Sequence, residues 1–255
     1  MKNMPYIYLY DGSLINLLNL IKYLYKNKMI PHNIKIFDYQ PNLLEEVVLI
    51  DFPNDENIIN DILKSLGSNI LNTIYYLYIS NEENKELLIF YFFGYSLKYK
   101  NKVFYMRNIN CISKSLKVAH YVTRENHKFK GFLRFKELQN KILYAEMEPE
   151  NDIILLLSKH FAKRLKNEYW IIKDVRRDTY SIYDKIEFRL VNGEEFTLNN
   201  NGFSNSEEMI QSLWKTFYKT IGISERKNER CRMNFMPKKY WKYILEVSDE
   251  LEKDS

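Results

Sequence analysis

The stretch of sequence with the most chemistry in a short span runs from residue 124 to residue 135. Its ionisable side chains are Arg124, Glu125, His127, Lys128, Lys130 and Arg134, and its aromatic side chains are Phe129, Phe132 and Phe135. Basic side chains contact phosphate groups, and aromatic faces stack on unpaired bases. The combination indicates a contact with nucleic acid. Phenylalanines in such a pattern more often belong to the protein core, so both interpretations of them stay open.

One carboxyl group and one imidazole in this stretch could transfer protons. Glu125 and His127 are the candidate catalytic residues, because such groups act as general acid and base. His120 and His127 fall on one helical stripe with Lys117 and Arg124. Positive neighbours repel a cation, so the sequence predicts no metal site.

Two further stretches combine basic side chains with possible phosphate chemistry. Residues 174–178 place adjacent arginines beside carboxylates, which suits either a phosphate clamp or a structural ion-pair network. Residues 225–241 join basic side chains to Tyr240 and Trp241, which act either as core anchors or as stacking platforms. The predicted nucleic-acid-binding residues are Lys117, Arg124, Lys128, Lys130, Arg134, Arg176, Arg177, Arg226, Lys227, Lys238 and Lys239.

The positive charge of the chain is concentrated in its middle. The whole sequence has 38 basic and 33 acidic side chains, a net charge of +5. Residues 101–177 hold 17 basic and 8 acidic side chains, and the basic character is strongest over 114–134 and 215–242. If the fold brings these two segments together, they form one positive surface that suits a polyanion. Two ordinary solvated faces balanced by nearby carboxylates are the alternative.

The periodicity of apolar residues predicts an α+β fold with a mostly helical N-terminal half and a C-terminal antiparallel sheet packed with helices. Short strands are expected over 6–10, 34–37 and 46–52, and helices over 14–25, 56–66, 69–79, 84–98, 115–129, 152–165, 207–221 and 238–247. A hairpin of strands 132–135 and 142–147 precedes strands 169–175, 179–184 and 186–191. The helix over 207–221 is expected to bury Ile210, Leu213, Trp214 and Phe217. We place a domain boundary near residue 110, between an N-terminal helical α/β region (1–110) and a basic α+β domain (111–255).

Several functional classes are poorly supported. The sequence has no phosphate-binding Gly-rich loop, no Cys-x-x-Cys pair and no Gly-x-Ser-x-Gly motif. Its two cysteines, Cys111 and Cys231, are too few and too far apart for a thiolate metal site. The longest apolar run, 87–93, is too short to span a membrane. The simplest expectation is a cytoplasmic protein without a membrane segment or a cofactor of its own.

The chain resembles an uncharacterised bacterial family associated with DNA metabolism and DNA repair. The matching motifs are Tyr10-Asp11-Gly12-Ser13, Glu125-x-His127-Lys128-x-Lys130-Gly131-Phe132-x-Arg134-Phe135, Tyr144-Ala145, Glu148-Pro149, His160-Phe161-x-x-Arg164, Trp170-Ile171-Ile172-x-Asp174-Val175-Arg176-Arg177, Tyr183-Asp184, Leu213-Trp214, Glu225-Arg226-x-Asn228 and Met236-Pro237-Lys238-Lys239-Tyr240-Trp241. Lys128 stands where the family motif usually reads Arg, which keeps the charge. Members tend to be encoded beside a radical-SAM protein related to DNA photoproduct lyases, or carry a fused uracil-DNA glycosylase domain.

The resemblance implies DNA and a radical-SAM protein as partners, and it places the iron–sulfur cluster and SAM in that partner. Three hypotheses follow. The first is a DNA-binding protein that works with the radical-SAM enzyme in repair or modification. The second is a DNA-processing enzyme in which Glu125 and His127 act beside a phosphate held by Arg176 and Arg177. The third is a scaffold whose tyrosine-rich N-terminal half docks the radical-SAM protein.

Overall fold

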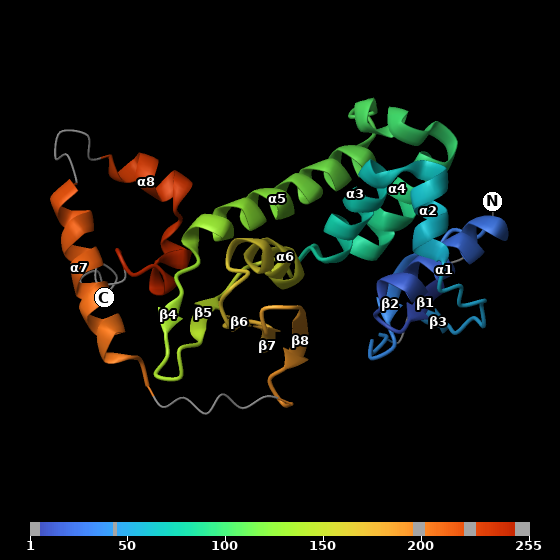
Figure 1. Ribbon diagram of the computed structural model, residues 1–255. Coiled ribbons are helices and arrows are strands. Elements are labelled where there is room, and N and C mark those ends of the chain that lie inside the picture. Colours follow the sequence, from blue (N-terminus) through green and yellow to red (C-terminus); the bar gives the residue numbers. More distant parts are fainter. Residues whose placement is uncertain (1–5, 43–44, 196–201, 222–227, 248–255) are drawn as a thin grey trace. The chain divides into compact units, whose positions relative to one another are not determined.

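The chain divides into two compact units, residues 1–123 and 124–255, and helix α5 (Asn110–Phe132) passes from one into the other (Figure 1). The computed structural model describes residues 6–42, 45–195, 202–221 and 228–247. The sequence-based boundary near residue 110 coincides with the start of α5, whereas the division between the units falls within this helix. None of the helices in the described residues combines the length and apolar character needed to cross a membrane.

The first unit contains a small parallel sheet. Its strands are β1 (Tyr6–Tyr10), β2 (Asn33–Ile36) and β3 (Glu46–Val48), in the order β2-β1-β3. Helix α1 (Leu14–Lys26) connects β1 to β2, and the Ser13 side chain caps it by accepting a hydrogen bond from the Asn16 amide. Most of β1 is buried, as expected for the central strand of a parallel sheet.

Helices complete the first unit. They are α2 (Ile58–Leu66), α3 (Ser68–Tyr78), α4 (Lys85–Tyr99) and the 3₁₀ helix η1 (Lys100–Tyr105). Tyr25 of α1 stacks on Phe90 of α4 with 4.5 Å between ring centroids, and its hydroxyl donates to the Phe90 carbonyl. Gly94 permits this approach, because a Cβ there would overlap the Tyr25 hydroxyl. The helices predicted from periodicity in this region are confirmed to within about two residues.

The second unit is built on a mixed five-stranded sheet. Its strands are β4 (Lys136–Glu137), β5 (Leu143–Met147), β6 (Trp170–Asp174), β7 (Thr179–Tyr183) and β8 (Phe188–Asn192), in sequential order. The α+β class is confirmed, but the wholly antiparallel sheet is wrong at one pair, because β5 and β6 run parallel. Helix α6 (Ile154–Arg164) lies between them in sequence and provides the crossover that a parallel pair requires.

The expected strand over 132–135 is also wrong. Helix α5 continues through Gly131 to Phe132, and the chain then runs without regular structure to the short strand β4. A glycine in a helix costs about 1 kcal/mol relative to alanine, which packing readily offsets. Phe129 is buried in the last turns of the helix, and Phe132, which follows the glycine, packs against Phe129 and Tyr240 with 6.2 and 5.9 Å between ring centroids. Packing of these rings favours continuation of the helix past the glycine.

The C-terminal elements are α7 (Asn205–Ile221), α8 (Glu229–Phe235) and the 3₁₀ helix η3 (Lys238–Tyr243). The longer helix expected over 238–247 is thus a short 3₁₀ segment. The expected burial of the apolar face of α7 is wrong. The exposed fractions on this face are 57% for Ile210, 58% for Leu213, 43% for Trp214 and 51% for Phe217. The start of α7 is anchored by the buried Glu207 carboxylate, which accepts from the Glu137 amide at 3.0 Å.

Candidate nucleic-acid interface

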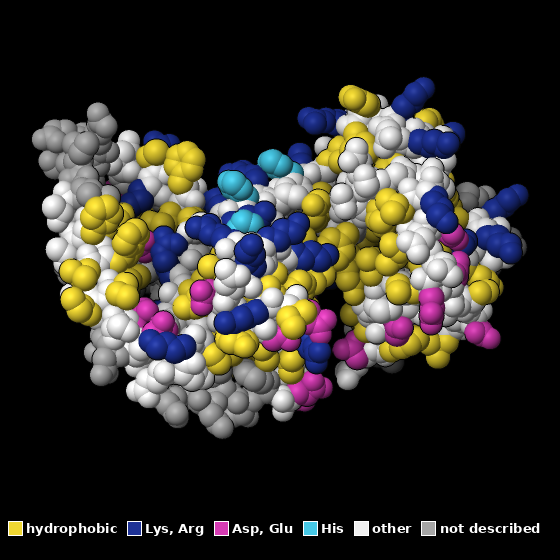
Figure 2. Space-filling model, viewed as in Figure 1, with side chains coloured by type: hydrophobic (Ala, Val, Ile, Leu, Met, Phe, Trp, Pro, Cys, Tyr) yellow, Lys and Arg dark blue, Asp and Glu magenta, His cyan; other side chains and the backbone are white. Residues whose placement is uncertain are grey.

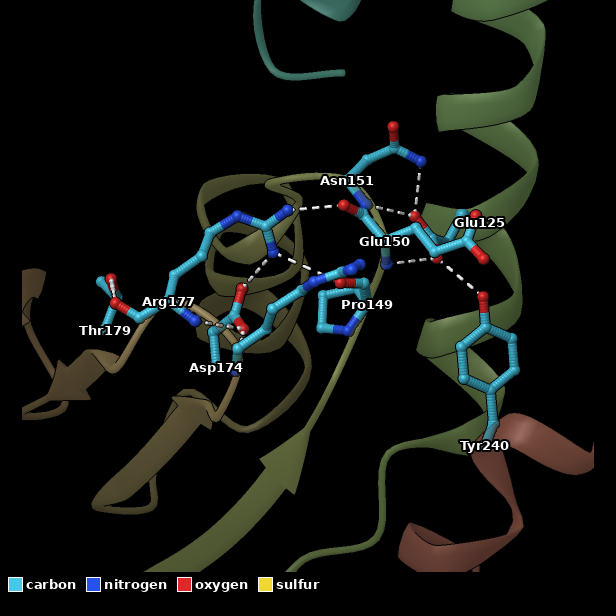
Figure 3. A network of polar contacts seen from close by, with 9 residues as sticks. Glu125, Pro149, Glu150, Asn151, Asp174, Arg177, Thr179 and Tyr240 are labelled. Carbon is cyan, nitrogen blue, oxygen red and sulfur yellow. Dashed lines mark hydrogen bonds and ion pairs between the residues drawn. The ribbon is translucent and has the colours of Figure 1, made fainter. Parts of the chain in front are cut away.

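The buried carboxylate of Glu125 is the centre of a polar network in the second unit (Figure 3). Glu125 is only 3% exposed, since it lies on the same side of α5 as the buried Val122 and Phe129. Four donors reach it. Its Oε1 accepts from the Glu150 amide at 2.8 Å and from the Tyr240 hydroxyl at 2.7 Å, and its Oε2 accepts from the backbone and side-chain nitrogens of Asn151 at 2.9 and 2.6 Å. Glu125 therefore joins α5 to the loop after β5 and to η3.

A second buried carboxylate holds the other side of the same loop. Asp174 ends β6, which is parallel to β5, so the chain segments that follow both strands meet at one edge of the sheet. Arg177 binds Asp174 at 2.9 Å and donates to the carbonyls of Pro149 and Glu150 at 3.3 and 2.6 Å (Figure 3). Burial raises the pKa of Asp174, and the positive charge of Arg177 opposes this change. Arg177 therefore has a structural role, because it joins the loop at Pro149 and Glu150 to Asp174 at the end of β6.

Three aromatic side chains of the predicted motifs, Phe129, Tyr240 and Trp241, lie in the core, whereas Phe132 and Phe135 are half-buried. Tyr240 and Trp241 are buried, and Phe129 meets the Tyr240 ring at 4.9 Å. The Trp241 indole donates to the Met236 carbonyl at 2.8 Å, and the Arg232 guanidinium lies 4.5 Å from its ring centroid. These rings anchor η3, and their buried positions favour the core interpretation over base stacking.

Two more of the predicted phosphate ligands are engaged with carboxylates. Arg134 binds Glu246 through two nitrogens, with a shortest separation of 2.8 Å. Burial raises the pKa of Glu246, but hydrogen bonds from Arg134 and Trp214 outweigh it and lower the pKa below its usual range. Lys239 forms an ion pair with Glu150 and lies over the Tyr240 ring. Lys238 lies 5.6 Å from the Trp241 ring centroid.

Three of the remaining predicted cations, Arg124, Lys128 and Lys130, lie on the second half of α5 and define the basic face of the second unit. Arg124 and Arg176 are exposed, and Lys128 and Lys130 are half-buried. Figure 2 shows Lys, Arg and His side chains gathered over α6 and the C-terminal part of α5. Burial lowers the pKa of Lys128, and the positive charges of Arg124 and Lys239 lower it further. Positive charge therefore accumulates around Lys128.

One of the predicted residues, Lys117, is exposed but belongs to the first unit. The predictions for Arg226 and Lys227 fall outside the described residues. Two residues of α6 that were not among the predicted contacts also belong to this region. The positive charges of Lys130 and of Arg164 both act on His160 and help to lower its pKa. Both residues belong to the motif His160-Phe161-x-x-Arg164, which the chain shares with the family that it resembles. This motif could have identified them from the sequence.

The structure separates the two candidate catalytic side chains. Residues two positions apart on a helix point about 200° apart, and Glu125 is buried whereas His127 is exposed. The Glu125 carboxylate is also saturated by donors from its own protein. This arrangement favours a positioning role for Glu125 over proton transfer with His127. Among the described residues, no group of three or more His, Cys, Asp or Glu side chains is placed to hold a metal ion.

We predict that Glu125→Gln destabilises the second unit. Glutamine replaces one acceptor oxygen with an N–H₂ group that faces N–H and O–H donors, so the free energy of unfolding should fall by about 3 kcal/mol. Urea unfolding followed by circular dichroism measures this change. His127→Gln is the matched control and should unfold like the wild type, because His127 is exposed. Equal stability of the Glu125→Gln and wild-type proteins would contradict the anchoring role.

The two adjacent arginines should behave differently. Arg177→Gln leaves the buried Asp174 carboxylate and two carbonyls without their partner, so the free energy of unfolding should fall by about 3 kcal/mol. Arg176→Gln should change it by less than about 0.5 kcal/mol, since its side chain is exposed. Urea unfolding of both variants tests this, and equal effects would show that the Asp174–Arg177 contact does not hold the loop.

One known protein family matches the part of the chain that contains most of the motifs found in the sequence. No curated protein matches the chain. The model of the family described as a domain of unknown function, DUF4130, matches residues 83–246. This range includes α5, the five-stranded sheet and the Glu125 network. Because the match covers more than half of the chain, the protein belongs to the DUF4130 family.

Proposed function

We propose that this protein binds DNA through the basic face of its second unit. The observation that carries the proposal is the arrangement of charges around the second half of α5. The Glu125 carboxylate is turned inward and bound by four donors, while Arg124 and Lys128 are on the accessible side of the same helix. Within the described residues, no carboxylate forms an ion pair with Arg124, Lys130 or Arg176. Such unneutralised cations contact phosphates and release counterions from a polyanion.

DNA repair or modification together with a radical-SAM protein is the biological context that we propose for this binding. It rests on the family resemblance, which pairs such chains with radical-SAM proteins. In this arrangement the iron–sulfur cluster and SAM belong to the partner, and the present chain holds the DNA. The chain then supplies affinity and position, and the chemistry takes place on the partner.

Removing the positive charges of the basic face should weaken DNA binding and its dependence on salt. In Arg124→Gln, Lys128→Gln and Lys130→Gln, each lost phosphate contact should reduce the slope of log affinity against log salt by about one unit. Fluorescence anisotropy with a labelled DNA duplex and a labelled single strand, measured over a salt series, gives this slope. Lys64→Gln is the matched control, because Lys64 is an exposed lysine on α2 of the other unit. Unchanged slopes in all three variants would contradict the proposal.

A scaffold for the radical-SAM protein is the second candidate function, and the exposed apolar face of α7 favours it. Ile210, Leu213, Trp214 and Phe217 recur at helical spacing, and each is more than 40% exposed. Exposed apolar surface of this kind is typical of protein–protein contacts. The observation moves the candidate docking surface from the N-terminal half to α7.

We predict that Leu213→Ser combined with Phe217→Ser reduces co-purification with the radical-SAM protein and leaves DNA affinity unchanged. Loss of two apolar anchors removes the burial that would drive docking. Tagged wild-type and variant chains expressed with the radical-SAM protein provide the measurement. Ile186→Ser is the control, since Ile186 is 87% exposed and lies outside α7. Undiminished co-purification of the double variant would argue against α7 as the docking surface.

A further inference from the structure

His160 has a buried ring nitrogen without a partner. Its Nε2 is shielded from solvent and makes no hydrogen bond to any described residue. The ring packs edge-on against Phe161, with 5.0 Å between centroids. A ring nitrogen of histidine is either a donor or an acceptor, and buried polar atoms are nearly always paired. An unpaired one is therefore a candidate for a contact with a ligand.

The charged groups that face His160 are both positive. Burial lowers the pKa of His160 below its ordinary value, and Lys130 of α5 and Arg164 of its own helix lower it further. Among the described residues, no carboxylate contributes an opposing effect at this histidine. A further buried atom without a partner, Oδ1 of Asn126, is on α5 one turn before Lys130. The neutral form of the imidazole is thus favoured, beside Lys130 and Arg164, with which no carboxylate of the described residues forms an ion pair.

Two cations and an imidazole N–H form a set of donors suited to a phosphate oxygen. We propose that Lys130, His160 and Arg164 form a subsite for one DNA phosphate, and that His160 takes up a proton when this phosphate binds. The inference rests on the proposed DNA-binding function and names one contact within it. Lys130 and Arg164 have long side chains that can rearrange around the phosphate and open a path to Nε2.

The sign of the pH effect follows from the charges. A bound phosphate brings negative charge next to His160 and offsets the repulsion from Lys130 and Arg164. The charged form of the imidazole is then favoured in the complex, so the complex binds more protons than the free protein does. DNA affinity should therefore increase as the pH falls through the pKa of His160 in the complex, and become constant below its pKa in the free protein.

Fluorescence anisotropy with a short labelled DNA duplex at constant ionic strength, from about pH 5.5 to about pH 8, tests the subsite. The wild type should bind more tightly towards low pH. His160→Gln, which keeps a side-chain N–H donor but does not titrate in this range, should bind as the wild type does at high pH and lose most of the increase at low pH. His32→Gln is the matched control and should retain the increase, because His32 is an exposed histidine of the first unit and is not part of the basic face.

The outcomes separate this inference from the proposed function. If His160→Gln gains affinity at low pH as the wild type does, the subsite is wrong, although salt-dependent DNA binding would stand. If no salt-dependent binding is found, the proposed function and the subsite both fail. NMR titration of the His160 ring resonances, with and without the duplex, is independent of any variant. A higher midpoint with the duplex supports the subsite, and an unchanged midpoint overturns it.

Discussion

The second unit depends on one buried carboxylate with four donors. Glu125 joins three segments that are distant in sequence, namely the middle of α5, the loop at Glu150 and Asn151, and Tyr240 of η3. An ionised carboxylate in an apolar interior is costly unless its lone pairs are satisfied. Here they are satisfied only when all three segments are in place. The contact therefore specifies the arrangement of these segments as well as stabilising it.

The contacts around Glu125 also determine which positively charged side chains are paired with carboxylates and which remain accessible to a ligand. The loop held by Glu125 is bound on its other side by Arg177, which is itself paired with Asp174. Arg134 is likewise committed to Glu246. Neighbouring arginines in the sequence thus have different roles, and Arg176 remains exposed. The carboxylates of Glu125, Asp174 and Glu246 are turned inward to structural partners. Lys and Arg side chains gather over α6 and the C-terminal part of α5 (Figure 2).

The parts of the fold that depend on local pattern could be predicted from the sequence. Apolar periodicity identified α1 and α6 almost to the residue, because an amphipathic stripe is a property of the segment itself. Properties that depend on a distant partner could not be predicted in this way. The parallel pairing of β5 and β6, the exposure of Trp214 on α7 and the unpaired nitrogen of His160 are all of this kind. Periodicity shows that a helix has an apolar face, but it does not show what covers it.

The same reasoning explains why Glu125 and His127, which the sequence suggested as a catalytic pair, lie on two different faces of one helix. Glu125 and His127 are close in sequence, and on a strand they would share a face, whereas on α5 they point to opposite sides. Val122, Glu125 and Phe129 form the buried stripe of α5. Arg124 and His127 are therefore exposed on the other side, and Lys128 is half-buried. The residues that stabilise the unit and those that present its charge alternate along one helix. A change in the helical pitch of α5 would therefore displace both the buried Glu125 carboxylate and the side chains of the basic face.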